Sequence, residues 1–100
     1  MSEIRVLIAD DHGIVREGLR SMLENAGLTV VGEAATGQQA VQLTDRLQPQ
    51  VVLLDIRMPG MDGLQALAQI KAANPHISVI MLTTYANPGY LARAVKAGAA

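Results

Sequence analysis

The sequence contains no cysteine and few aromatic residues: two Tyr, no Phe and no Trp. Without thiols the chain has neither a disulfide framework nor a thiolate metal site, and it is compatible with a reducing cytosol. Because so few side chains could stack on bases, a platform for single-stranded nucleic acid is not expected.

The sequence also lacks an excess of charge of either sign. Eight basic and nine acidic residues give a net charge of −1, which argues against direct binding of nucleic acid or of an anionic membrane by this segment. The first residues do not resemble a signal peptide, and the longest apolar runs, such as 51–54, are far too short to span a bilayer. We therefore expect a cytoplasmic protein that has no membrane partner.

The 100 residues suffice for one domain, and half of them are apolar. Short apolar runs alternate with stretches of helical period. The runs that predict strands are 4–9, 28–34, 51–54 and 77–82. The stretches that predict helices are 12–26, 37–47, 64–73 and 88–97.

Two of these helical stretches show an apolar stripe that should face a core. In the first helix the stripe comprises Ile14, Val15, Leu19, Met22, Leu23 and Ala26. In the second helix it comprises Ala40, Val41, Leu43 and Leu47.

Strands and helices in strict alternation predict an α/β, doubly wound parallel sheet covered on both faces, with strand order 2-1-3-4. The pattern stops after the fourth helix and the small-residue run 97–100. Since such a sheet normally continues, we expect the chain to be cut before a fifth strand and a fifth helix.

Functional groups of an open parallel sheet gather at the carboxyl ends of its strands. The polar residues that follow three of the strands are Asp10 and Asp11, Asp55 and Arg57, and Thr83 and Thr84. With the expected strand order, three carboxylates and a hydroxyl should converge on one edge.

Close carboxylates need a counter-charge, because two like charges 4 Å apart repel by roughly 4 kcal/mol at an effective dielectric constant of 20. Hard oxygen ligands suit Mg²⁺. A metal between carboxylates also suits phosphoryl transfer, in which a carboxylate can be the nucleophile and form an aspartyl phosphate.

Three segments, residues 4–12, 51–63 and 79–84, together resemble the signature motifs of response regulator receiver domains, and the resemblance covers residues 1–100. Residues 11–19, Asp-His-Gly-Ile-Val-Arg-Glu-Gly-Leu, further resemble the NarL/FixJ-type (LuxR-like) subfamily. The resemblance implies the flavodoxin-like receiver fold and a role in a two-component phosphorelay.

The resemblance also implies roles for individual residues. Asp55 would accept the phosphoryl group, and Asp11, Asp55 and the backbone carbonyl of Arg57 would bind Mg²⁺ directly, while Asp10 would act mainly through a bound water. The hydroxyl of Thr83 would follow the phosphoryl group. A further implied feature is a tight turn into the third helix at Gly63.

The implied partner is a sensor histidine kinase, and receiver domains catalyse their own phosphorylation and dephosphorylation. Homodimerisation is a further expectation. DNA would be bound only through a C-terminal helix-turn-helix domain that residues 1–100 do not include. The family's lysine at the end of the fifth strand is not expected within residues 1–100. Lys71 and Lys96 fall on predicted helix surfaces and are not expected to take its role.

Other interpretations stay open at this point. Asp10 and Asp11 could simply cap the first helix, and Asp62 could shape the turn of 59–63 rather than bind metal. His12 is expected to be exposed rather than a ligand, since Mg²⁺ prefers oxygen. The chain could also be a receiver that is not phosphorylated and serves as a dimerisation or interaction module. A flavin-binding domain is disfavoured, because Asp10 and Asp11 would repel a phosphate.

Overall fold

The computed structural model describes residues 3–56 and 58–82, and these form a four-stranded parallel sheet with helices on both faces. The order of the strands is β2-β1-β3-β4, as the sequence predicts. The strands are β1 (Arg5–Ala9), β2 (Thr29–Ala34), β3 (Val51–Asp55) and β4 (Ser78–Leu82). The helices are α1 (Gly13–Asn25), α2 (Gly37–Leu47) and α3 (Gly63–Ala73). The helix expected over 88–97 lies outside the described residues.

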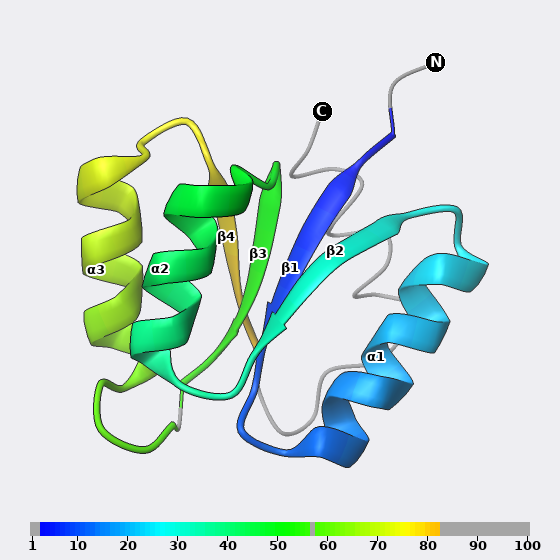
Figure 1. Ribbon diagram of the computed structural model, residues 1–100, viewed down its shortest axis with the longest axis horizontal. Coiled ribbons are helices and arrows are strands. Elements are labelled where there is room, and N and C mark those ends of the chain that lie inside the picture. Colours follow the sequence, from blue (N-terminus) through cyan, green and yellow to red (C-terminus); the bar gives the residue numbers. More distant parts are fainter. Residues whose placement is uncertain (1–2, 57, 83–100) are drawn as a thin grey trace.

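The sheet separates two apolar clusters, one under α1 and one under α2 and α3. Figure 1 shows α1 on the right of the sheet and the other two helices on its left. Because side chains alternate along a strand, Val6 and Ile8 of β1 pack with Leu23 of α1, whereas Leu7 of β1 packs on the other side with Ala40 of α2. Residues 6–9 of β1 and 51–54 of β3 are therefore buried on both faces, which explains why these residues are all apolar.

The pairing register brings the carboxyl ends of β1 and β3 level with each other. Ala9 is the partner of Leu54, so that Asp10 follows β1 opposite Asp55. On the other side of β3, Asp55 pairs with Leu82, the last residue of β4. The edge at which the three strands end is therefore also the edge at which the acidic residues gather.

The start of α1 differs from the prediction. Ile14 is 86% exposed and Val15 is also exposed, although both belong to the predicted inner stripe. In Figure 1 the first turn of α1 lies beyond the ends of β1 and β2, so that neither strand lies beneath this turn. Only the later part of the stripe packs on the sheet, with Leu23 fully buried and Leu19 partly buried.

The second helix follows the prediction more closely. Ala40 is buried, and the other predicted inner residues, Val41, Leu43 and Leu47, pack partly buried against the same cluster. Thr44 is an additional buried residue on this face, where its hydroxyl donates to the carbonyl oxygen of Ala40 at 2.6 Å. That bond satisfies the hydroxyl and allows a polar residue on an inner face.

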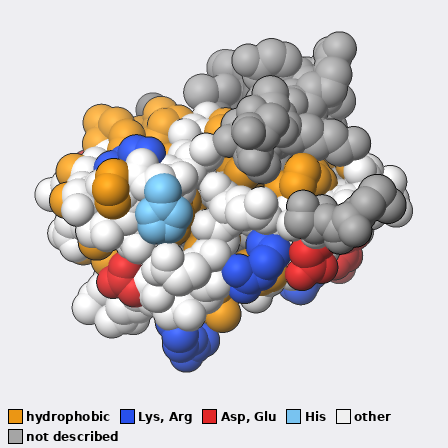
Figure 2. Space-filling view, turned by 90° about the horizontal axis from the view of Figure 1, so that it is seen from above, with side chains coloured by type: hydrophobic (Ala, Val, Ile, Leu, Met, Phe, Trp, Pro, Cys, Tyr) orange, Lys and Arg blue, Asp and Glu red, His pale blue; other side chains and the backbone are white. Residues whose placement is uncertain are grey.

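At the opposite edge, where the strands begin, the described residues include basic and acidic side chains (Figure 2). Lys71 belongs to this edge, because its ammonium group donates to the carbonyl oxygens of Pro75 and Ile77 at 3.0 and 2.7 Å in the turn before β4. Lys71 is thus remote from Asp10, Asp11 and Asp55 at the carboxyl edge, as expected for a lysine on a helix surface. Within the described segments, no helix combines the length and the apolarity that crossing a membrane requires.

The two ends of α1 should respond differently to the loss of side-chain volume. We expect Leu23→Ala to lower the free energy of unfolding by about 2–5 kcal/mol, because it leaves a cavity in the cluster under α1. Ile14→Ala should change it by no more than about 0.5 kcal/mol, since the side chain is already in water. Chemical denaturation measures both values, and similar losses in the two variants would contradict this placement of α1.

Candidate functional site

Four side chains with ligand atoms meet at the carboxyl edge of the sheet: Asp10, Asp11, His12 and Asp55. One ligand atom of each lies within 4.8 Å of the ligand atoms of the others. We call this group the acidic cluster. The sequence predicts the convergence of the three carboxylates, and the described structure brings them together as expected. It also adds His12.

Asp10 is the buried member of the cluster, with 5% of its surface exposed. Its N–H donates to the carbonyl oxygen of Ala34 on β2 at 3.0 Å, which extends the pairing of β1 with β2 by one residue. Its carboxylate oxygen Oδ1 accepts the N–H of His12 at 2.8 Å. The bond from the N–H of His12 compensates in part for the cost of removing the carboxylate from water.

The interpretation of Asp10 and Asp11 as helix caps is wrong. The residue that precedes the first turn of α1 is His12, and no side chain caps the helix there. The carboxylate of Asp10 instead bonds the N–H of His12, within a turn that leads the chain from the strand into the helix. The two carboxylates are thus directed to the cluster.

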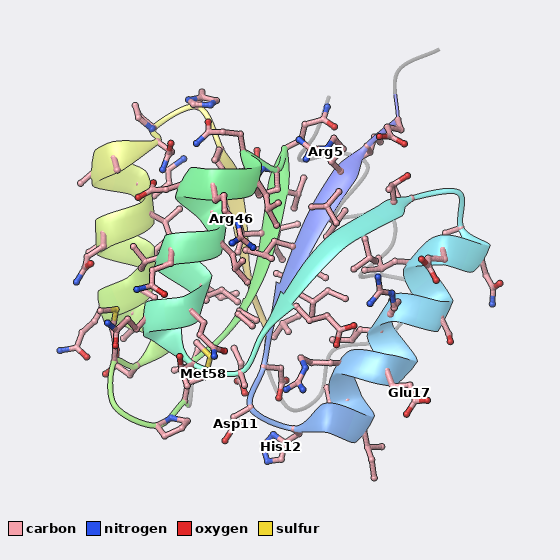
Figure 3. All side chains as sticks on the ribbon, in the orientation of Figure 1. Arg5, Asp11, His12, Glu17, Arg46 and Met58 are labelled. Carbon is pink, nitrogen blue, oxygen red and sulfur yellow. The ribbon has the colours of Figure 1, made fainter. Side chains whose placement is uncertain are left out.

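His12 extends into solvent and also contacts both carboxylates. Its side chain is 67% exposed, and its Nδ1 lies 3.0 Å from Oδ1 of Asp10 and 3.0 Å from Oδ1 of Asp11. Figure 3 shows Asp11 and His12 next to each other below the end of β1, while Glu17 points away on α1. The sequence predicts that His12 is exposed, but it does not predict the contact of His12 with the two carboxylates. The position of His12 directly after Asp10 and Asp11 is the one feature of the sequence that points to this contact.

The carboxylates raise the pKa of His12 above its ordinary value of 6.5. The main cause is the hydrogen bond from the imidazole to Asp10, followed by the negative charge of Asp11, with a smaller attraction from Asp55. The protonated, positively charged form of the His12 imidazole is therefore favoured beside these carboxylates.

Asp55 ends β3, and its backbone is held tightly by the start of α3. A Cβ atom at Gly63 would lie 2.1 Å from the carbonyl oxygen of Asp55 and 2.7 Å from Cα of Ile56. The N–H of Gly63 donates to the carbonyl oxygen of Ile56 at 2.8 Å. The expectation of a tight turn at Gly63 is correct, and only glycine allows so close an approach.

The loop between Asp55 and Gly63 is anchored at its far end by Asp62. The carboxylate of Asp62 accepts the N–H of Gln65 at 2.8 Å, and the side chain of Gln65 accepts the N–H of Asp62 at 3.0 Å. This reciprocal pair is a capping box at the start of α3. Asp62 therefore shapes the turn, as expected, and is not a member of the acidic cluster.

The geometry suits a divalent cation. Three carboxylates offer hard oxygen atoms at one point, and the exposed Asp11 leaves room for water or a further ligand on the solvent side. Arg57 and Thr83 complete the predicted site, but these residues lie outside the described part of the chain.

Comparison with known proteins agrees with the fold. The family profile of the response regulator receiver domain matches residues 6–100. The transcriptional regulatory protein YdfI of Bacillus subtilis is 44% identical over 96 residues, which are 95% of this chain and 45% of that protein. The chemotaxis protein CheY of Listeria monocytogenes is 41% identical, over 96% of this chain and 81% of that protein.

This chain is also similar to a solved structure, the signal receiver domain of the putative response regulator NarL from Mycobacterium tuberculosis. It superposes with a TM-score of 0.79 at 35% identity, over 99% of this chain and 77% of that one. This chain spans less than half the length of YdfI, so the likeness to that regulator concerns one part of it.

Removing the negative charge of Asp11 should lower the pKa of His12 toward its ordinary value. Because the pKa in the folded state is raised, protonated His12 stabilises the fold below pH 6.5, and this contribution is lost as the pH rises through the raised pKa. Asp11→Asn should therefore reduce the stabilisation seen at low pH. An NMR titration of the imidazole measures the pKa directly.

The matched control is Glu17→Gln, which removes one exposed carboxylate of α1 that has no part in the cluster. It should leave the titration of His12 nearly unchanged. Equal shifts in the two variants would mean that net charge, rather than the contact with Asp11, sets the pKa of His12.

Proposed function

The chain belongs to the family of response regulator receiver domains, and on that basis we propose that Asp55 accepts a phosphoryl group with the help of Mg²⁺. The observation that supports this most is the convergence of Asp10, Asp11 and Asp55 at the carboxyl edge of the sheet. Asp55 is the member that ends the central strand β3, and it is partly exposed. It can therefore be reached by a donor from solvent.

The proposed cation site uses oxygen atoms only. Asp11 and Asp55 would bind Mg²⁺ directly, together with the backbone carbonyl of Arg57, and Asp10 would bind through a water. A bound Mg²⁺ would neutralise the carboxylates and the charge on the oxygens of the transferred phosphoryl group. Asp10 supports this role from a fixed position, because the bond from its N–H to Ala34 attaches it to β2.

The proposed transfer is a displacement at phosphorus. A carboxylate oxygen of Asp55 would attack the phosphorus of a phosphohistidine on a sensor histidine kinase, as receiver domains interact with such kinases. The new O–P bond forms as the P–N bond breaks, and the electron pair of that bond returns to the imidazole nitrogen of the kinase. Water would later release phosphate in the same site. The domain would thus catalyse its own phosphorylation and dephosphorylation.

The phosphoryl group would then be sensed by the hydroxyl of Thr83, which directly follows β4 in the sequence. A bond between this hydroxyl and a phosphoryl oxygen would bias a two-state element that includes β4 and the segment after it. This assignment rests on the resemblance of the 79–84 motif to the family.

We propose that this domain is part of a cytoplasmic transcriptional regulator. Several similar proteins are named as regulators, among them YdfI and the response regulator GacA of Pseudomonas viridiflava, which is 41% identical over 46% of its length. The remaining part of the parent protein would be a C-terminal helix-turn-helix domain that binds DNA. Homodimerisation of the receiver would then couple phosphorylation to DNA binding.

Incubation with Mg²⁺ and a small acyl phosphate donor tests the proposal. We expect the intact mass to rise by one phosphoryl group in the wild type and not in Asp55→Asn, nor in the wild type when the metal is chelated. The matched control is Asp62→Asn in the same loop, since asparagine also caps a helix. This variant should still be phosphorylated.

Failure of the wild type to gain mass, both with the acyl phosphate and with a phosphorylated histidine kinase as donor, would contradict the proposal. It would leave the receiver fold in an interaction module that is not phosphorylated. Gain of mass in Asp55→Asn would assign the acceptor to another residue.

A further inference from the structure

Arg16 connects the backbone of the acidic cluster to the edge strand β2. Its Nη1 donates to the carbonyl oxygen of Asp10 at 2.6 Å, and its Nε donates to Oε1 of Glu33 at 3.1 Å. Both side chains are partly buried. The guanidinium group therefore holds two acceptors at once in a fixed geometry, which a lysine cannot reproduce.

The bond to Asp10 fixes the peptide group that carries the chain from Asp10 to Asp11. The pairing of β1 with β3 ends at Ala9, so that this carbonyl lies beyond the last pair of that ladder. The N–H of Asp10 is held by Ala34 of β2, and its carbonyl oxygen is held by Arg16. The two bonds restrain the consecutive peptide planes on either side of the Asp10 Cα, and they thereby restrain the position from which the Asp11 side chain leaves the backbone.

The carboxylate of Glu33 is held in place by a second arginine as well. Arg20, one turn further along α1, forms an ion pair with Oε2 of Glu33, and it also approaches Glu24 at 3.7 Å. The carboxylate of Glu33 thus receives both arginines, one on each oxygen. Arg20 has the same partner as Arg16, but no bond from it to the 10–12 segment is seen in the described structure.

We propose that Arg16 is a positioning residue for the cation site, acting through the Asp10 carbonyl to orient Asp11. This proposal rests on the proposed function, in which the carboxylates of the acidic cluster bind Mg²⁺. Charge alone would have the opposite effect, because a positive group beside the cluster repels a cation. Removal of the orienting bonds should weaken Mg²⁺ binding, whereas removal of a mere charge should strengthen it.

The substitution Arg16→Lys separates the two effects, because it keeps the charge and loses the fork. We expect the dissociation constant of Mg²⁺, measured by calorimetry on the whole chain, to rise about 10-fold, as is typical when a group that orients a metal ligand is lost. Arg20→Lys is the matched control with the same chemical change and the same partner. Its dissociation constant should stay close to that of the wild type, because none of the hydrogen bonds that Arg20 makes in the described structure reaches residues 10–12.

A second readout needs no metal. The N–H of His12 donates to Oδ1 of Asp10, so its hydrogen exchange, followed by NMR, reports the order of the turn. We expect faster exchange of this amide in Arg16→Lys than in Arg20→Lys, with thermal unfolding showing both variants folded. If wild type bound no Mg²⁺, the proposed function would fail, and the exchange of this amide would still decide whether Arg16 orders the turn.

Two results would overturn the positioning role. One is an equal change of Mg²⁺ affinity in Arg16→Lys and Arg20→Lys, which would mean that both arginines only stabilise the fold. The other is unchanged hydrogen exchange of His12 in Arg16→Lys, which would show that the turn keeps its shape without the fork.

Discussion

The carboxylates of Asp10, Asp11 and Asp55 repel one another, and the structure of the carboxyl edge of the sheet depends on this repulsion. The register of β1 with β3 forces the first and the last of these residues to lie opposite each other, and the turn after β1 adds Asp11. A fold that brings like charges together loses stability unless a cation compensates for them. In the described structure the imidazole of His12 lies against two of the carboxylates. The family to which the chain belongs suggests that Mg²⁺ takes over this compensation in the working protein.

The surrounding structure keeps these charges in place rather than relieving them. Gly63 lets the start of α3 approach the backbone of Asp55 closely, and the capping box of Asp62 holds the end of the loop that leads into α3. On the other side, Arg16 and Ala34 bond the two polar groups of the Asp10 backbone. The rigid parallel sheet thus serves a local purpose: it holds oxygen atoms at fixed positions against their own repulsion.

Much of this could be predicted from the sequence, because it depends on patterns that neighbouring residues carry. The strand order and the convergence of Asp10 with Asp55 follow from the alternation of elements and from the rule for parallel sheets. The exposure of Ile14 could not be predicted, because a helical period does not reveal where the sheet beneath a helix ends. The contacts of His12 and the link from Arg16 to Glu33 depend on the backbone angles of one turn and on the register of an edge strand. No local pattern encodes either.

The most direct test of the account is the location of a bound divalent cation. Mn²⁺ can replace Mg²⁺ at oxygen sites, and its paramagnetism broadens the NMR signals of nearby amides. If the acidic cluster is the cation site, the amides of Asp11 and Asp55 should broaden first, while those of Gln50 and Ile77 at the opposite edge stay sharp. Broadening that is absent, or that is equal at both edges, would contradict the central claim that this edge of the sheet is built to hold a cation.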